Sequence, residues 1–148
     1  MAKEEIRVLI AEDHFAVRQM ISMAMRAKDV VTVDSALNGK QCRDMIDQAI
    51  AMGKPYHMVF LDWDMPLIMG IDILKHFRAQ PQFANTAFVM VTAMSLQAQV
   101  IEAVKAGATA YMIKPVSQNA IAKKYDEILV WIARQRLAED SKKSAAAK

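Results

Sequence analysis

The sequence has a single cysteine, Cys42, in 148 residues. One thiol excludes an internal disulfide and is typical of a protein from a reducing compartment, and we interpret Cys42 as a small apolar packing residue. Only four glycines and four prolines occur, and together with 54% hydrophobic residues they exclude a disordered chain and favour a globular one rich in helix. No run approaches the roughly 18 apolar residues that span a bilayer, and the N-terminus carries no signal-like segment. We therefore expect a cytoplasmic protein without membrane insertion.

The charge is equally modest, at +3 overall, and three lysines in the last eight residues supply it: Lys142, Lys143 and Lys148. Without them the chain is close to neutral, which gives little support to direct nucleic-acid binding. The length suits one domain with one substantial core. We expect a domain over 1–136 and a polar, lysine-containing tail or linker over 137–148, with no room for a DNA-binding module.

Short apolar runs alternate with segments of helical periodicity along the chain. Strands are predicted over 7–11, 30–33, 57–61, 88–91 and 111–113. Helices are predicted over 15–28, from the Asn38-Gly39 turn to Gly53, from Gly70 to Pro81, from Leu96 to a cap at Gly107, and over 117–136. The helix before Gly107 would place Leu96, Val100, Ala103 and Val104 on one face. Alternation of this kind predicts an α/β domain with a parallel sheet covered on both faces.

Four of these strands end on polar residues suited to chemistry: Glu12 and Asp13, Asp62, Thr92, and Lys114. Ligands of open parallel sheets bind beyond the carboxyl ends of the strands. Carboxylates gathered there repel one another unless a cation intervenes, and Mg²⁺ suits oxygen ligands. An ionised Asp62 could then attack a phosphoryl group, with Lys114 as a positive centre and Thr92 as a hydroxyl donor. Ala93 would leave space beside the phosphorus.

The motifs Leu9-Ile10-Ala11-Glu12-Asp13, Leu61-Asp62-Trp63-Asp64-Met65-Pro66 with Gly70, Val91-Thr92-Ala93, and Tyr111-Met112-Ile113-Lys114-Pro115 stand at these strand ends. Over about residues 5–135 the chain resembles the receiver domain of two-component response regulators, in particular single-domain regulators of the chemotaxis type. The resemblance implies a flavodoxin-like, doubly wound (βα)5 fold with a five-stranded parallel sheet of order 2-1-3-4-5.

By the same resemblance Asp62 is the phosphoacceptor, and Glu12, Asp13, Asp62 and the backbone carbonyl of Asp64 hold Mg²⁺, for which Mn²⁺ is a possible substitute. Thr92 and Lys114 would bind the phosphoryl group, and the Lys114–Pro115 peptide bond is expected to be cis. The chain would be a signalling domain and not an enzyme, promoting only its own phosphorylation and dephosphorylation.

The resemblance also implies a switch in which Thr92 moves toward the phosphoryl group and Tyr111 turns into the space vacated. This changes the surface formed by the fourth helix, fifth strand and fifth helix, where a downstream protein would dock. The expected donor is a histidine kinase or a histidine phosphotransfer protein, and the expected oligomeric state is a monomer or weak dimer. Asp64 and Met94 flank the path of water to the phosphoryl group and are expected to set its lifetime. Met69 and Met94 both depart from the commonest receiver pattern, in which polar residues are frequent.

Other interpretations stay open on the sequence alone. The chain could be a phosphorelay intermediate, the receiver of a longer regulator, or a binding module that kept the fold without phosphorylation. Asp62 and Asp64 after an apolar strand also resemble the first motif of haloacid-dehalogenase-like phosphatases, although Pro66 and the third-strand position argue against it. A flavin site lacks its phosphate loop. His14, beside the acid pair, is interpreted as an exposed polar residue at a helix start.

Overall fold

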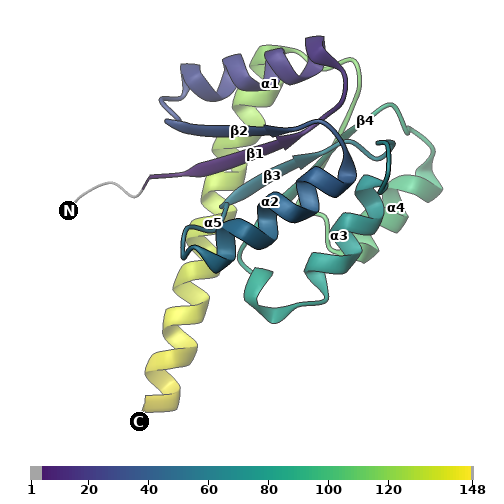
Figure 1. Cartoon of the computed structure of the whole chain (residues 1–148). Helices are drawn as coiled ribbons and strands as arrows, with labels where there is room; N and C mark the ends of the chain where they lie inside the picture. The colour runs from purple at the N-terminus through teal and green to yellow at the C-terminus, as the bar shows by residue number, and fades with distance from the viewer. Residues whose placement is uncertain (1–4, 148) are drawn as a thin grey trace.

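The computed structural model describes residues 5–147, in which parallel strands alternate with helices (Figure 1). The strands are β1 (Arg7–Ala11), β2 (Thr32–Ala36), β3 (Met58–Leu61), β4 (Ala87–Thr92) and β5 (Ala110–Ile113). The helices are α1 (Phe15–Ala27), α2 (Gly39–Ala51), α3 (Gly70–Arg78), α4 (Gln97–Ala106) and α5 (Gln118–Ala147), with a short 3-10 helix η1 (Pro81–Phe83). All strand pairs are parallel, in the order β2-β1-β3-β4-β5. The flavodoxin-like topology predicted from the sequence is confirmed.

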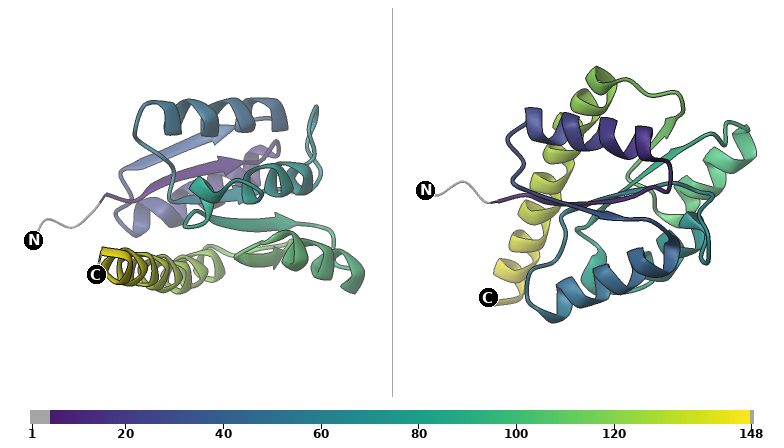
Figure 2. Two further views of the ribbon diagram at one scale, coloured as in Figure 1. Left: turned by 90° about the horizontal axis from the view of Figure 1, so that it is seen from below. Right: turned by 45° about the horizontal axis from the view of Figure 1, so that its top comes forward.

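Helices cover both faces of this sheet, α1 and α5 on one and α2, α3 and α4 on the other (Figure 2). Successive strand residues point to opposite faces, so Val8 of β1 joins the core under α1 and α5 while Leu9 joins the core under the other three helices. Cys42 is fully buried in the core under α2, α3 and α4, as its interpretation as a packing residue predicted. Burial on both faces explains why the strands read as continuous apolar runs.

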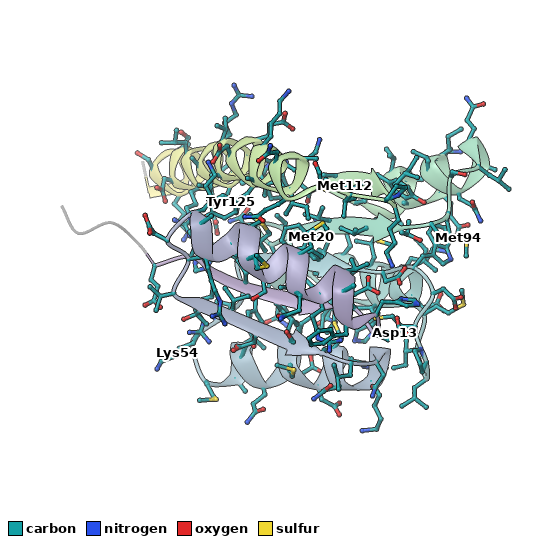
Figure 3. All side chains as sticks on the ribbon, turned by 90° about the horizontal axis from the view of Figure 1, so that it is seen from above. Asp13, Met20, Lys54, Met94, Met112 and Tyr125 are labelled. Carbon is teal, nitrogen blue, oxygen red and sulfur yellow. The ribbon has the colours of Figure 1, made fainter. Side chains whose placement is uncertain are left out.

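The two ends of the sheet differ in character. Figure 3 shows Asp13 and Met94 at one end of the molecule and Lys54 at the other, with Met20 and Met112 between them. The first end is formed by the carboxyl ends of the strands, where the sequence places its acidic pair. Because all strands are parallel, every strand delivers the residue that follows it to this same edge.

The second strand was wrongly placed by the sequence analysis at 30–33, and it occupies Thr32–Ala36. The β-branched run there indicated a strand, but its first residues belong to a turn. The Val30 amide donates to the Met25 carbonyl at 3.0 Å after a left-handed Asp29 (φ 61°), and Val31 is 82% exposed. Register with β1 begins only where Arg7 pairs with Thr32. The other four strands differ from prediction by at most one residue at either end.

The last helix is longer than predicted, because α5 continues through the expected tail to Ala147. The loss of apolar periodicity after Arg136 was interpreted as the end of the helix, but it marks only the end of burial. Residues 137–146 are exposed, as expected of a solvated segment, and they include three alanines and two lysines, residues that favour helix without packing. Lys143 and Glu139 form an i,i+4 ion pair along this part of α5.

The predicted apolar face of α4 is largely exposed. Ala103 is fully buried, whereas Leu96 and Val104 are 68% and 60% exposed. Gly107 ends the helix in the left-handed conformation that was expected of it (φ 102°). Among residues 5–147 no helix has both the length and the apolar character needed to cross a membrane.

Candidate functional site

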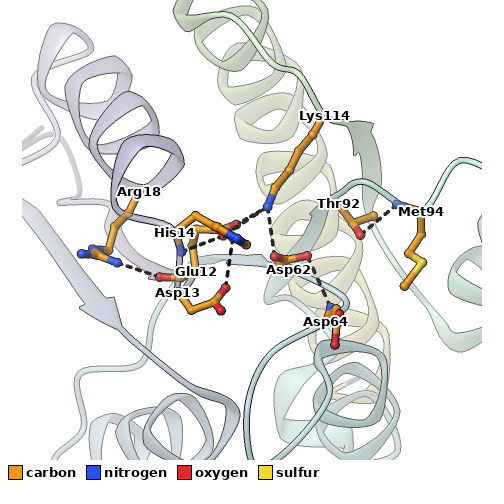
Figure 4. A network of polar contacts seen from close by, with 9 residues as sticks. All are labelled: Glu12, Asp13, His14, Arg18, Asp62, Asp64, Thr92, Met94 and Lys114. Carbon is orange, nitrogen blue, oxygen red and sulfur yellow. Dashed lines mark hydrogen bonds and ion pairs between the residues drawn. The ribbon is translucent and has the colours of Figure 1, made fainter.

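The strand ends bring the predicted polar residues to one point. Ala11 pairs with Leu61 across β1 and β3, so Glu12 and Asp62, one residue further on, lie side by side (Figure 4). The Asp62 amide donates to the Ala11 carbonyl at 3.0 Å and fixes this arrangement. Lys114 reaches the same point from β5, where its amide donates to the Thr92 carbonyl at 2.8 Å. Backbone hydrogen bonds of the sheet thus position the side chains.

The ammonium group of Lys114 lies between the two buried carboxylates. Its Nζ donates to Asp62 Oδ2 at 3.0 Å and to Glu12 Oε1 at 3.1 Å. Glu12 and Asp62 are 1% and 4% exposed. Two carboxylates buried to this extent would destabilise the fold if no cation lay beside them. Lys114 supplies one positive charge, which the two carboxylates share.

Burial and charge shift the pKa values in this cluster. Burial raises the pKa of Glu12, and the nearby charge of Asp62 raises it further, against the opposing hydrogen bond from Lys114. For Lys114, burial alone would lower the pKa, but hydrogen bonds to Asp62 and Glu12 outweigh it and the pKa is raised. The ammonium is therefore fully charged at neutral pH.

The acidic side chains leave unsatisfied bonding capacity that suits a divalent cation. Ligand atoms of Glu12, Asp13, His14 and Asp62 all lie within 4.8 Å of one another. Glu12 Oε2 is buried, accepts no hydrogen bond from any described residue, and lies 3.0 Å from Lys114 Nζ in an ion pair. Carboxylate oxygens clustered at this separation fit a hard cation such as Mg²⁺.

The loop after Asp62 is held close beneath the carboxylate. The Gly70 amide donates to the Trp63 carbonyl at 2.8 Å, and a Cβ at Gly70 would stand 1.9 Å from the Asp62 carbonyl oxygen. A side chain there is therefore excluded by backbone atoms. The Asp64 amide points back to Asp62 Oδ1 at 3.4 Å, so the loop faces the carboxylate with an N–H group.

Thr92 and Tyr111 are both linked to the backbone of Met94. The Met94 amide donates to Thr92 Oγ1 at 3.2 Å, and the Tyr111 hydroxyl donates to the Met94 carbonyl at 2.6 Å. Thr92 is buried, whereas Tyr111 is half-buried and has a raised pKa, from burial first and then from the charge of Asp62. The β4–α4 loop therefore connects the two residues predicted to form a switch.

The remaining predicted residues lie at the rim. The side chains of Asp64 and Ala93 are exposed, and Met94 is half-buried. The Lys114–Pro115 peptide bond is cis, as the resemblance predicted. Asp64 thus contacts Asp62 through its backbone amide, and no described contact joins the two carboxylates.

Sequence reasoning gave no role to His14 or Arg18, yet both contact the acid pair. His14 is 68% exposed, in agreement with its interpretation, but its Nδ1 lies 3.0 Å from Glu12 Oε1 and 3.3 Å from Asp13 Oδ1. The Arg18 guanidinium donates to the Glu12 carbonyl at 3.0 Å. The four-residue spacing of His14 and Arg18 could have indicated these contacts, because side chains one helical turn apart lie on the same side of a helix and so face the same strand end.

Comparison with known proteins identifies the family of the chain. The response regulator receiver domain family matches over residues 8–126. The chemotaxis protein CheY-3 of Vibrio cholerae is 31% identical over 127 residues, which cover 84% of this chain and 92% of that protein. The chemotaxis protein CheY of Pseudomonas aeruginosa is 28% identical over 123 residues, covering 83% of this chain and 95% of the relative.

Solved structures show the same fold. Chemotaxis protein CheY4 of Vibrio cholerae superposes with a TM-score of 0.72 at 24% identity, over 84% of this chain and 99% of that one. A CheY-like receiver domain protein from Methanospirillum hungatei gives a TM-score of 0.77 at 20% identity, over 89% and 99%. The fold is that of CheY-like receiver domains. The chain belongs to the response regulator receiver domain family.

Proposed function

We propose that Asp62 accepts a phosphoryl group from the phosphohistidine of a histidine kinase or phosphotransfer protein. A carboxylate oxygen of Asp62 would form the new O–P bond while the P–N bond to the donor imidazole breaks, and the imidazole leaves with the bonding pair and takes up a proton. The observation that carries this proposal is the position of Asp62, buried at a strand end between the Lys114 ammonium and the Glu12–Asp13 pair.

Glu12, Asp13, Asp62 and the backbone carbonyl of Asp64 would hold Mg²⁺, with Mn²⁺ as a substitute. The cation would neutralise the negative charge that the incoming phosphoryl oxygens bring to a site already rich in carboxylates. The clustering of these carboxylate oxygens supports this assignment, because the single ammonium of Lys114 leaves a net negative charge in a largely buried site.

Lys114 and Thr92 would bind the transferred group. Lys114 already donates to Asp62 Oδ2, and a phosphoryl group on this carboxylate would lie within the reach of its flexible ammonium. Thr92 Oγ1 accepts the Met94 N–H and so keeps its own proton free for donation to a phosphoryl oxygen. The Lys114 ammonium and the Thr92 hydroxyl would thus stabilise the negative charge on the phosphoryl oxygens, which reaches the site only when transfer begins.

The Met94 contacts support a switch. Movement of Thr92 toward the phosphoryl group would lengthen the hydrogen bond that Thr92 Oγ1 accepts from the Met94 amide. The carbonyl of Met94 in turn accepts the hydrogen bond of the Tyr111 hydroxyl. Displacement of this loop would release Tyr111 to turn inward and would move the start of α4. Exposed apolar side chains on α4 and β5, Ile101, Val104 and Ile113, offer a protein partner a surface that this movement alters.

Phosphorylation by acetyl phosphate tests the proposal without the cognate kinase. We expect intact-mass spectrometry to detect one labile phosphoryl adduct per chain in Mg²⁺ and none in EDTA. Asp62→Asn should abolish the adduct, whereas Asp47→Asn, on the exposed face of α2, should leave it unchanged. An adduct that persists in Asp62→Asn, or its absence in the wild type, would contradict the proposal. Continuous turnover of a small phosphomonoester would instead favour a phosphatase.

A further inference from the structure

Arg78, the last residue of α3, joins several segments near the amino-terminal ends of β4 and β5. Its guanidinium donates to the Gly107 carbonyl at 2.9 Å, to the Phe83 carbonyl at 2.8 Å and to Thr109 Oγ1 at 3.2 Å. The guanidinium also lies over the ring of Phe88, 4.9 Å from its centroid. One side chain thus connects α3 to η1, to β4, to the C-cap of α4 and to the residue before β5.

The chemistry of Arg78 suits a structural junction. Burial lowers the pKa of this half-buried guanidinium, and no carboxylate among residues 5–147 lies close enough to offset the fall. Its acceptors are neutral oxygens in three different segments, which the planar fork of an arginine can reach together and a lysine ammonium cannot. The fit around Gly107 is close, because a Cβ there would stand 2.4 Å from Arg78 Cγ.

The start of α4 is attached to a different part of the molecule. The Gln99 side chain accepts from the Leu96 amide at 3.1 Å and donates to the Met94 sulfur at 3.1 Å. Met94 is also the residue whose backbone contacts Thr92 and Tyr111. The start of α4 is therefore tied to the loop that the proposed switch displaces, whereas its end is tied through Arg78 to α3 and η1.

Between these two ends α4 packs loosely beside α3 (Figure 1). Of the ten residues of α4, all of which the structure describes, Ala103 alone is buried. Lys75 and Glu102 form an ion pair between α3 and α4 at 2.9 Å, but both side chains are about half exposed, and such pairs contribute at most about 1 kcal/mol. Elements with few buried contacts are the ones that move at low cost.

We propose that Arg78 is a positioning residue that fixes the C-terminal end of α4, so that the helix turns about Gly107 when the β4–α4 loop is displaced. The inference rests on the switch in the proposed function. A ten-residue helix is a rod of about 15 Å, so the displacement would be largest at its start and would fall toward Gly107. The turn would tilt the exposed side chains of Ile101 and Val104 without moving α3.

Amide hydrogen exchange of the full chain, followed residue by residue by NMR, tests this inference. Beryllofluoride with Mg²⁺ serves as the probe of the phosphorylated state. In the wild type we expect the probe to change exchange over residues 94–100 at least about fivefold and over residues 103–109 less than about twofold. Equal changes at the two ends of α4, or an unchanged α4 in protein that forms the Asp62 adduct, would overturn the inference.

Arg78→Lys separates positioning from simple stabilisation, because it keeps the charge and loses the fork. Exchange over residues 103–109 should rise at least about tenfold with the probe bound and less than about threefold without it. Lys75→Met, which removes the exposed ion pair between the same two helices, should leave these residues unchanged in both states. A rise of the same size in both states of Arg78→Lys would overturn the inference. Failure of the proposed function would appear separately, as wild-type protein that forms no adduct at Asp62 with acetyl phosphate and Mg²⁺.

Discussion

At the scale of single residues, Lys114 balances the charges of the site. One ammonium group contacts two buried carboxylates, at 3.0 Å to Asp62 and 3.1 Å to Glu12. Breaking a buried ion pair from one side costs more than the pair contributes, because the remaining charge is left without a partner. We therefore expect Lys114, which we propose binds the phosphoryl group, also to stabilise the free protein.

Replacement of Lys114 by methionine should lower the free energy of unfolding by about 3 kcal/mol at pH 8 in the absence of metal. Burial already raises the pKa of Glu12, and loss of Lys114 removes the group that opposes the rise. A carboxyl group whose pKa is higher in the folded state stabilises the fold at low pH and loses this contribution as pH rises through the folded-state value. The deficit measured by urea denaturation should therefore be smaller at pH 5 than at pH 8.

Lys40→Met is the matched control, since the Lys40–Asp44 pair is exposed on α2 and should contribute less than about 1 kcal/mol. Equal losses in the two variants would show that Lys114 does not stabilise the buried carboxylates.

At the scale of elements, the sequence predicted the order and kind of every strand and helix except η1, because buried parallel strands are continuous apolar runs. It also predicted Asp62, Thr92 and Lys114 at one edge, since parallel strands share a carboxyl end. It misplaced β2, an edge strand whose β-branched run begins within a turn, and it ended α5 where burial ends. The contacts of His14 and Arg18 depend on side-chain directions, which hydrophobic periodicity does not report.

Gly70 begins α3, and the loop that follows Asp62 can pack against α3 only because Gly70 has no side chain. Gly70→Ala places a Cβ 1.9 Å from the Asp62 carbonyl oxygen and must displace the backbone. We expect a loss of at least about 2 kcal/mol in unfolding free energy, together with a lower yield of phosphoryl adduct. Gly53→Ala is the control: its Cβ would have no neighbour within 4 Å, so only the left-handed backbone (φ 72°) opposes it, at about 1 kcal/mol. Wild-type adduct yield and stability in Gly70→Ala would refute the close fit of this loop.

The exposed end of α5 should contribute helix but little stability. Termination of the chain after Arg136 removes residues whose described side chains are exposed, so the unfolding free energy should change by less than about 1 kcal/mol while the helical circular dichroism falls. Ile132→Ala, in the buried part of the same helix, should cost about 2 to 4 kcal/mol. A truncated chain as unstable as Ile132→Ala would indicate that the extension packs on the domain, beyond its Asn85–Glu139 hydrogen bond.

At the scale of the whole molecule, a stable two-faced sheet supports a cluster of like charges at one edge. The core on either face is apolar and fully buried, so it can offset the local repulsion among Glu12, Asp13 and Asp62. A cation at this edge would bind the folded state alone, because the carboxylates meet only when the strands are paired. Metal binding should therefore be linked to global stability.

Magnesium at a hundred times its dissociation constant should raise the unfolding free energy by about 2.7 kcal/mol. Asp13→Asn should remove most of this increment, while the metal-free variant should be at least as stable as the wild type, because one of three repelling charges is gone. Thermal unfolding with and without Mg²⁺ measures both effects. A full Mg²⁺ increment in Asp13→Asn would place the cation elsewhere.

The most direct test of the central claim is to locate the phosphoryl bond. Protein treated with acetyl phosphate and Mg²⁺ can be reduced with borohydride, which converts an aspartyl phosphate to homoserine, and then digested and sequenced by mass spectrometry. The account predicts homoserine at position 62 and aspartate retained at positions 13 and 64. Homoserine at either of those positions, with Asp62 unmodified, would contradict it.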